Sequence, residues 1–247
     1  MKNLQGKVAV ITGASKGIGA GTAKALAANG VSVVVNYASS KASAEFVVEA
    51  INLSGGKAVA VLGDITKISD AQGIVDAAMK EYGRLDILVN NAGCYEFAAL
   101  EAITEESFHK HFNLNVLGLL LVTQAASRHL GTGGSIINIG SGVTRMKPPM
   151  VAVYAGTKGA VEAITGVLAK ELAPRKIRVN SLNPGLVETE GTHAAGMIGA
   201  EMEKEFVAHT PLGRVGQPQD IAAVAVFLAS DDSGWITGEV IVASGGL

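Results

Sequence analysis

The sequence predicts a single α/β domain in which a doubly wound parallel sheet is covered by helices on both faces. Short runs of β-branched residues alternate with longer amphipathic stretches from residue 7 to residue 183, as in chains built of β-α-β units. These short runs are almost continuously apolar, which is typical of strands buried on both faces. No linker, low-complexity segment or repeat of fixed period divides the 247 residues, so we expect one domain.

The same alternation predicts the position of each element. We expect strands at 8–11, 31–36, 57–62, 85–89, 135–139, 177–182 and 239–242. We expect helices at 17–29, 40–53, 69–82, 104–130, 153–173 and 218–230, several of which are followed by glycine or proline. The segment 186–214 is rich in glycine, histidine and methionine and has no strand pattern, so we expect a flexible lid there.

The composition excludes several kinds of protein. The 20 basic and 22 acidic residues give a net charge of −2 without a basic stripe, so we expect no nucleic-acid partner. The single cysteine, Cys94, excludes an internal disulfide framework and fits a reducing compartment. Residues 1–7 lack the apolar run of a secretory signal, and the longest apolar stretch, 116–122, is too short to span a bilayer. We therefore expect a cytoplasmic protein without a membrane partner.

A glycine-rich loop joins the first predicted strand to the first predicted helix. Gly13, Gly17 and Gly19 let the backbone turn tightly and approach a pyrophosphate, which the free N–H groups of the helix N-terminus would bind. The spacing is Gly-x-x-x-Gly-x-Gly, and it does not match a P-loop. The structural alternative is a turn that merely joins strand to helix.

The end of the second strand indicates which dinucleotide is bound. An NAD site usually has an acidic residue about 20 residues beyond the glycines. Here residues 36–41 read Asn-Tyr-Ala-Ser-Ser-Lys, and the first carboxylate is Glu45. Hydroxyls, an amide and a lysine suit a 2′-phosphate, with help from Lys16 in the glycine loop. The sequence therefore predicts NADP(H), with a solvated polar turn as the structural alternative.

A tyrosine and a lysine four residues apart occur twice in the chain. Tyr154 and Lys158 fall in a predicted helix, so their side chains share one face. A nearby ammonium lowers a tyrosine pKa, and such a phenol can exchange a proton at ordinary pH. Tyr37 and Lys41 have the same spacing but fall in a predicted loop at the adenosine end of the cofactor. Only the first pair is therefore interpreted as catalytic.

The chain resembles the short-chain dehydrogenase/reductase family over essentially its whole length. The resemblance implies one Rossmann-type domain with a seven-stranded parallel sheet, a cofactor half at about 1–140 and a catalytic half at about 141–247. It also implies a dimer or tetramer, of which we expect the homotetramer. The motifs that carry it are residues 12–19, Asp64, Asn90-Asn91-Ala92-Gly93, Asn115, Ser141, Tyr154 with Lys158, and Asn183-Pro184-Gly185 followed by Thr189.

The resemblance implies a role for each motif residue. Tyr154 would be the general acid toward a carbonyl, with Lys158 lowering its pKa and binding ribose hydroxyls. Ser141 would hydrogen-bond the substrate oxygen, and Asn115 would hold a water in a proton relay. Asp64 and the backbone of Ile65 would bind the adenine. The other expected cofactor contacts are Gly13, Ser15, Lys16, Gly17, Ile18, Gly19, Asn36, Tyr37, Ala38, Ser39, Ser40, Asn91, Ala92, Gly93, Pro184, Gly185, Val187 and Thr189.

Each of these residues also has a structural interpretation. Ser141 lies between two glycines and could be a turn residue, Asn115 could be a helix bend or a buried amide, and Asp64 could cap the next helix. Two positions depart from the family pattern. Position 140 is glycine where a second hydroxyl is frequent, and Ala-Gly-Thr separates Tyr154 from Lys158.

The remaining histidines and the cysteine are not expected to be functional. Cys94 has no apparent histidine partner, so we interpret it as structural. His109 and His111 are two residues apart, which predicts different helix faces and surface positions. His129, His193 and His209 are scattered, and no metal site is expected.

We expect a mainly apolar substrate pocket. Its walls would come from 95–97, 143–150 and 186–206, with apolar side chains from Val143, Met146, Met150, Met197, Met202 and Phe206. An acidic acyl carrier protein would need a basic docking patch, but 128–134 contains one arginine, and position 170 is lysine. We therefore favour a carbonyl reductase acting on small ketones or alcohols over a 3-oxoacyl-(acyl-carrier-protein) reductase. A non-catalytic NADP(H) sensor or scaffold is a further alternative, which the complete set of catalytic motifs disfavours.

Overall fold

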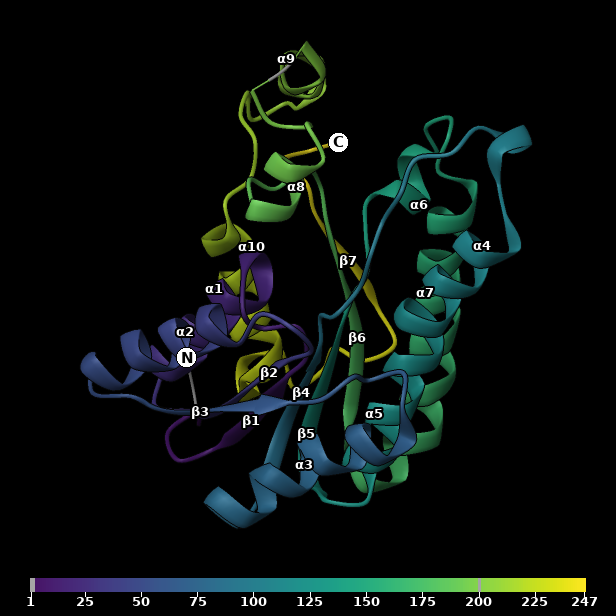
Figure 1. Ribbon diagram of the computed structural model, residues 1–247. Helices are drawn as coiled ribbons and strands as arrows, with labels where there is room; N and C mark the ends of the chain where they lie inside the picture. Colours follow the sequence, from purple (N-terminus) through teal and green to yellow (C-terminus); the bar gives the residue numbers. More distant parts are fainter. Residues whose placement is uncertain (1–2, 200) are drawn as a thin grey trace.

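The computed structural model describes residues 3–199 and 201–247 and confirms the predicted α/β domain. In the described part of the chain, seven strands form one sheet in the order β3-β2-β1-β4-β5-β6-β7, and all six pairings are parallel (Figure 1). The strands are β1 (Val8–Ile11), β2 (Ser32–Tyr37), β3 (Lys57–Leu62), β4 (Leu85–Asn90), β5 (Leu130–Ile139), β6 (Arg178–Pro184) and β7 (Val240–Ala243).

Helices cover both faces of this sheet. In Figure 1, α1, α2 and α10 lie on one face and α3, α5 and α7 on the other. The α-helices are α1 (Gly17–Ala28), α2 (Lys41–Leu53), α3 (Ile68–Tyr82), α4 (Glu105–Phe112), α5 (Leu119–Ser127), α6 (Val143–Met146), α7 (Ala152–Leu172), α8 (Glu190–Ala194), α9 (Glu201–His209) and α10 (Pro218–Ala229). Short 3-10 turns are η1 (Leu100–Ala102), η3 (Ala173–Arg175) and η4 (Asp231–Ser233), and η2 (Asn113–Gly118) is a π-helical turn.

The two faces of β1 show why the strands are continuously apolar. Val8 and Val10 belong to the core that contains α3 and α5, whereas Ala9 and Ile11 belong to the core that contains α1 and α10. Side chains alternate across a strand, so a strand with a core on each side needs an apolar residue at every position. Burying one such side chain stabilises the fold by about 1.5–3 kcal/mol.

The predicted single helix at 104–130 is wrong in two respects. The helical stretch is divided by the π-helical turn η2 between α4 and α5. Leu130 is not helical but starts β5, where it pairs with Leu85 across a register shift. The strand signal was missed because residues 131–134 are Gly-Thr-Gly-Gly, which has no strand pattern.

The sheet topology creates one crevice. The strand order reverses between β1 and β4, and ligands of open α/β sheets bind outside the carboxyl ends of the strands at such a point. The segment 186–214 follows β6 at this end and carries α8 and α9 (Figure 1). Its described residues, 186–199 and 201–214, form no named strand, as predicted, apart from a single bridge between Val187 and Gly216. No helix among the described residues combines the length and hydropathy needed to cross a membrane.

Candidate active site

A cavity of about 230 Å³ opens at the carboxyl ends of the central strands. Its polar wall includes Ser141, Tyr154 and Lys158, three of the residues expected to be catalytic. The other lining residues are largely apolar, as predicted, and come from the loop after β4, from α6 and from the segment 186–214: Tyr95, Phe97, Val143, Met146, Pro148, Val151, Leu186, Val187, Met197 and Phe206.

Lys158 lies beneath Tyr154 on α7. Its side chain is only 6% exposed, and Nζ donates a hydrogen bond of 2.8 Å to the Ile139 carbonyl at the end of β5. The ammonium lies 5.8 Å from the centre of the Tyr154 ring. Burial lowers the pKa of Lys158 to about 8. A buried lysine with this pKa is poised to exchange a proton near neutrality.

The pKa of Tyr154 differs from the sequence-based expectation. Burial raises the pKa of this phenol, and the Ser141 hydroxyl partly opposes the rise. The expected lowering by Lys158 is not observed, because Lys158 is not among the groups that shift this pKa. A raised pKa keeps the phenol protonated at neutral pH, which is the form that a general acid requires.

Ser141 follows β5 and faces Tyr154 across the cavity. Its Oγ accepts a hydrogen bond of 3.2 Å from the backbone N–H of Val143. Because this bond uses a lone pair and not the hydroxyl proton, Ser141 keeps its own O–H available for donation. The turn interpretation and the catalytic interpretation of Ser141 are therefore compatible.

Asn115 lies in the π-helical turn η2 and is 2% exposed. Its Oδ1 accepts from the Cys94 N–H at 2.8 Å, and its Nδ2 donates to the Cys94 carbonyl at 2.9 Å. Nδ2 also donates to Thr157 Oγ1 at 3.1 Å, and that hydroxyl donates to the Tyr154 carbonyl. Asn115 is thus both a helix irregularity and a buried amide, and it joins the loop after β4 to α7. Its role in a proton relay stays a prediction.

The glycine loop lies against the loop after β4. Gly13 has a φ of +60°, and a Cβ there would lie 2.8 Å from the Cα of Ala92, so only glycine permits this approach. Thr12 Oγ1 accepts from the N–H groups of Asn91 and Ala92, and Asn91 Nδ2 donates to the carbonyls of Thr12 and Gly13. The two predicted cofactor loops therefore form one hydrogen-bonded unit.

The side chains of Asn36 and Tyr37 are less available to a ligand than predicted. Asn36 is 2% exposed; its Oδ1 accepts from the Gly13 N–H at 3.2 Å, and its Nδ2 donates to the Gly63 carbonyl at 3.0 Å. Tyr37 lies at the end of β2, not in a loop, and packs in the core on the α1 side. Both side chains thus support the glycine loop and the sheet, so their ligand role stays a prediction.

The residues that follow them are exposed. Ser39 and the Lys16 side chain face solvent, Ser40 is partly buried, and none of the three side chains has a hydrogen-bond or ionic partner among residues 3–199 and 201–247. Lys41 lies at the start of α2, 3.7 Å from Glu45. Donors are therefore free at the position where the 2′-substituent of a ribose was expected.

Two other predicted contacts have structural roles in the protein. Asp64 Oδ1 accepts from the backbone N–H and hydroxyl of Thr66, so the carboxylate holds the turn before α3. Thr189 is the N-cap of α8, where its Oγ1 accepts from the Thr192 N–H at 3.1 Å. Thr189 also lines the cavity. Their contacts with adenine and carboxamide stay predictions.

Glu190 is a residue that the sequence interpretation missed. Its Oε2 accepts a hydrogen bond of 3.0 Å from the N–H of Gly17, the first residue of α1. A carboxylate therefore lies where a pyrophosphate was predicted, which shows that this helix N-terminus accepts an anion. The donor set fits a dinucleotide. No sequence pattern linked two residues so distant along the chain.

Three expectations about individual side chains are wrong. Met150 and Met202 do not line the cavity but are 53% and 41% exposed. His111 is not a surface residue: it is 1% exposed, and its Nδ1 lies 2.7 Å from the Ser107 carbonyl. His111 is buried because it lies on the face of α4 that packs against the rest of the protein. No group of potential metal ligands occurs among the described residues.

Cys94 lines the same cavity as the residues predicted to be catalytic, but its surroundings do not activate its thiol as a nucleophile. It is half-buried and lines the cavity. Burial raises the pKa of its thiol, more than the nearby Lys110 lowers it. A thiol that stays protonated is a poor nucleophile, which supports the structural interpretation.

Comparison with known proteins identifies the family. A family model described as enoyl-(acyl carrier protein) reductase matches residues 13–247. An uncharacterized oxidoreductase of Methylorubrum extorquens is 66% identical over 247 residues, which cover 100% of both chains. A hydroxynaphthalene reductase-like protein of Metarhizium brunneum is 42% identical and covers 99% of this chain and 96% of its own.

Solved structures agree with this assignment. A short-chain dehydrogenase/reductase from Serratia marcescens superposes with a TM-score of 0.93 and 37% identity, covering 98% of each chain. The angucycline C-6 ketoreductase LanV with bound NADP has the same score and identity, covering 99% of this chain and 96% of its own. The protein therefore belongs to the short-chain dehydrogenase/reductase family of oxidoreductases.

Proposed function

We propose that the protein catalyses the reversible, NADPH-dependent reduction of a ketone to a secondary alcohol. One observation carries the proposal: two hydroxyl donors, Ser141 and Tyr154, line the same apolar cavity directly above the buried ammonium of Lys158. The cofactor would supply a hydride to the carbonyl carbon. The negative charge that then develops on the carbonyl oxygen is what these two donors would stabilise.

Each side chain has one step in this reaction. Ser141 donates a hydrogen bond to the carbonyl oxygen through the proton that its bond with Val143 leaves free. Tyr154 transfers its phenolic proton to the same oxygen, which completes the alcohol. Lys158, with its pKa near 8, takes part in returning a proton to the resulting phenolate.

The preference for NADPH rests on the end of β2. Ser39, Ser40 and Lys16 offer hydroxyls and a cation there, and a cation hydrogen-bonded to a phosphate contributes about 1.5–3 kcal/mol. Two of the similar solved structures contain bound NADP or NADPH.

Replacing Lys16 by alanine should raise the KM for NADPH about tenfold or more, with little change for NADH. Ser39→Asp should shift the preference toward NADH; an unchanged cofactor ratio in both variants would contradict the assignment.

The substrate is proposed to be a ketone on an apolar, ring-containing skeleton. Tyr95 and Tyr154 lie with ring centres 6.0 Å apart, and Phe97, Met146 and Phe206 add further apolar wall. Similar proteins are named hydroxynaphthalene reductase-like protein, elsinochrome reductase and angucycline C-6 ketoreductase. Methionine adapts to different shapes, so we expect tolerance among cyclic ketones.

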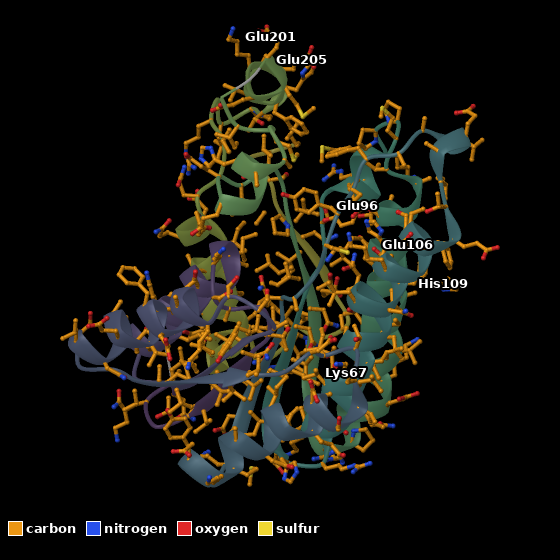
Figure 2. All side chains as sticks on the ribbon, in the orientation of Figure 1. Lys67, Glu96, Glu106, His109, Glu201 and Glu205 are labelled. Carbon is orange, nitrogen blue, oxygen red and sulfur yellow. The ribbon has the colours of Figure 1, made fainter. Side chains whose placement is uncertain are left out.

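An acyl carrier protein is the alternative source of the substrate. Figure 2 shows Glu201 and Glu205 on α9, and Glu96 and Glu106 near α4. Glu96 is paired with Lys110, so that cation is not available to a partner. Glu201 is likewise paired with Lys204, but Glu106 and Glu205 have no ion-pair partner among residues 3–199 and 201–247 and disfavour an acidic carrier. We therefore propose free ketones as the substrates.

One assay separates these possibilities. NADPH and NADH oxidation would be measured with a panel of cyclic ketones such as tetralone, with a free 3-oxoacyl thioester and with the same acyl group on its carrier protein. We expect turnover of the cyclic ketones with NADPH. Efficient turnover of the carrier-bound substrate alone would establish the alternative, and cofactor binding without any turnover would favour a sensor. The predicted homotetramer would be checked by light scattering on the same preparation.

A further inference from the structure

The glycine at position 140 has a specific structural cause. A Cβ there would lie 2.0 Å from Asn183 Oδ1 and 2.7 Å from Ser181 Oγ. No side chain fits at such distances, because the atoms in the way are held between buried strands. The amide of Asn183 therefore occupies the space that a side chain at position 140 would need.

Asn183 uses this position to hold the carbonyl of Ser141. The asparagine is fully buried at the end of β6. Its Nδ2 donates to the Ser141 carbonyl at 3.0 Å and to Glu162 Oε1 at 2.7 Å. Its Oδ1 accepts from the Ser181 hydroxyl at 2.7 Å. Both amide protons are thus committed, one to the catalytic loop and one to a carboxylate on α7.

Thr144 is a second residue whose hydroxyl is oriented by Glu162. Its Oγ1 lies 2.5 Å from Glu162 Oε1 and 3.1 Å from the Ser141 carbonyl. A hydroxyl has a single proton, and the shorter contact to the charged acceptor takes it. The Glu162 carboxylate therefore sets the orientation of Thr144 as well as that of Asn183.

Glu162 lies on the helix that carries the other two catalytic groups. Tyr154, Lys158 and Glu162 are spaced four residues apart along α7, which places them on one face. Lys158 binds the Ile139 carbonyl, two residues before Ser141. The end of β5 is therefore attached to α7 at two points, directly through Lys158 and indirectly through Glu162.

We propose that Glu162 is a positioning residue, which fixes Ser141 relative to Tyr154 through Asn183. The proposal rests on the reaction proposed above, in which both hydroxyls bind one carbonyl oxygen. A displacement of about 1 Å in a catalytic group can lower the rate about 100-fold. Losing the carboxylate leaves Asn183 without its second acceptor, so the amide that binds the Ser141 carbonyl is no longer held in one orientation.

The primary test compares three variants of α7. Glu162→Leu removes the acceptor, Glu162→Gln keeps an acceptor oxygen without the charge, and Glu171→Leu alters an exposed glutamate of the same helix as a control. We expect Glu162→Leu to lower kcat about 10- to 100-fold, with the KM for NADPH unchanged. Glu162→Gln should recover most of that kcat, and Glu171→Leu should match the wild type.

Two outcomes would overturn the proposal. If Glu162→Leu retains kcat and loses only thermal stability, the network is merely structural. If Glu162→Gln is as slow as Glu162→Leu with the same NADPH affinity, the charge is required and positioning is not the role. The pH dependence of kcat should keep the same midpoint in both Glu162 variants, because the titrating groups are unchanged; a shifted midpoint would also contradict positioning.

A second set of variants applies if Glu162→Leu does not fold. Asn183→Ala removes the amide, and Gly140→Ser then places a hydroxyl in the space it leaves. We expect Gly140→Ser alone to be strongly destabilised by collision with Asn183, Asn183→Ala alone to lose kcat, and the double variant to recover both stability and part of the kcat. If the two substitutions are additive, position 140 and Asn183 are not coupled and the proposal fails.

A readout without turnover separates this proposal from the proposed reaction. A crystal structure of Glu162→Gln should retain the positions of Ser141 and Thr144, whereas one of Asn183→Ala should show the Ser141 carbonyl displaced. If the wild type reduces no ketone but these displacements occur, the reaction is wrong and the positioning role stands. If Ser141 stays in place in Asn183→Ala, the positioning role is wrong regardless of activity.

Discussion

The two ends of the parallel sheet use buried charge in opposite ways. At the amino ends, the guanidinium of Arg178 is surrounded by protein acceptors. At the carboxyl ends, the ammonium of Lys158 is buried with one hydrogen-bond acceptor, the Ile139 carbonyl, in the described part of the chain. This difference indicates that the amino end of the sheet stabilises the fold. At the carboxyl end, the Lys158 ammonium retains N–H donors that can bind a ligand.

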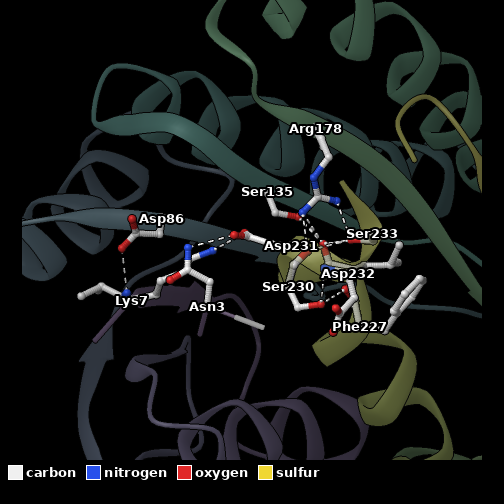
Figure 3. A network of polar contacts seen from close by, with 12 residues as sticks. Asn3, Lys7, Asp86, Ser135, Arg178, Phe227, Ser230, Asp231, Asp232 and Ser233 are labelled. Carbon is white, nitrogen blue, oxygen red and sulfur yellow. Dashed lines mark hydrogen bonds and ion pairs between the residues drawn. The ribbon is translucent and has the colours of Figure 1, made fainter. Parts of the chain in front are cut away.

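The amino-end network joins the C-terminal part of the chain to the first strands. Arg178 donates to the Ser233 hydroxyl at 2.8 Å and to the carbonyls of Leu228 and Ser230 (Figure 3). Asp231 Oδ1 lies 3.1 Å from Lys7 Nζ, and its Oδ2 accepts from Asn3 Nδ2. Burial lowers the pKa of Arg178, and Asp231 opposes this. Guanidinium groups stay charged in proteins, so these bonds persist over the whole working pH range.

The largest effect is expected at the carboxyl end. Tyr154→Phe removes the proton donor but keeps the ring, so we expect kcat to fall about 100- to 10,000-fold. The melting temperature and the affinity for NADPH should be unchanged. Tyr95→Phe is the matched control, because its hydroxyl lines the same cavity without a hydrogen-bond partner among the described residues. A Tyr154→Phe enzyme with wild-type kcat would mean that another group supplies the proton.

The second prediction concerns Lys158, where activity and stability should change in opposite directions. Lys158→Met should abolish activity but raise stability at pH 7. The fall in the Lys158 pKa from 10.5 to about 8 corresponds to about 3 kcal/mol, whereas the lost bond to Ile139 contributes about 1 kcal/mol. Methionine keeps the length of the side chain without its charge.

The pH dependence of this stability difference has a definite sign. Below about pH 8 the lysine is protonated in both the folded and the unfolded state, so the wild type carries the full penalty of burying the charge. Between about pH 8 and 10.5 the unfolded chain binds more protons, so the stability of the wild type rises with pH. Denaturant titrations should therefore show the advantage of Lys158→Met shrinking over that interval. An advantage that is constant with pH would contradict the burial explanation.

The third prediction tests the amino end. Arg178→Met should destabilise the protein by about 3 kcal/mol, or roughly 6–12 °C in melting temperature for a chain of this size. The kcat of the folded enzyme should not change, because the network lies at the opposite end of the strands. Lys57→Met alters an exposed cation at the amino end of β3 and serves as the control. If Arg178→Met lowered kcat without lowering stability, the amino end of the sheet would not have the purely stabilising role that distinguishes it from the carboxyl end.

The sequence predicted the sheet and the shared helix face of Tyr154 and Lys158 because both depend on local patterns. Continuous apolar runs identify strands with a core on each side, and the Tyr154–Lys158 spacing reports one helix face directly. A helix bend at Asn115 was one of the structural alternatives, but its π-helical form was not predicted, because the Cys94 carbonyl and N–H that bind the amide are 21 residues away along the chain. The start of β5 at Leu130 was hidden by the glycines that follow.

The positions that sequence interpretation missed are those defined by contacts between distant segments. The side chain of Asn36 is of a type that can bind a ligand, but its amide forms hydrogen bonds with Gly13 and Gly63 instead. Glu162 could be found from the sequence, since it continues the four-residue spacing of Tyr154 and Lys158 along α7. Its partners on β6 and after β5 could not, because no sequence pattern connects them to α7. Burial of His111 likewise depends on which face of α4 meets the rest of the fold.

The smallest expected effect concerns Glu190, which binds the N–H of Gly17 at the start of α1. If this carboxylate occupies the position of the cofactor's pyrophosphate, Glu190→Gln should tighten NADPH binding about two- to fivefold, the usual size of an anion's interaction with a helix N-terminus. Glu188→Gln removes the same charge two residues away, where the carboxylate binds His193 and Gln217 instead, and should leave the affinity unchanged. Fluorescence titration of NADPH at low and high salt measures both variants, and the Glu190→Gln effect should shrink at high salt. Weaker binding in Glu190→Gln would instead mean that the carboxylate holds the segment 186–214 in the conformation that the cofactor requires.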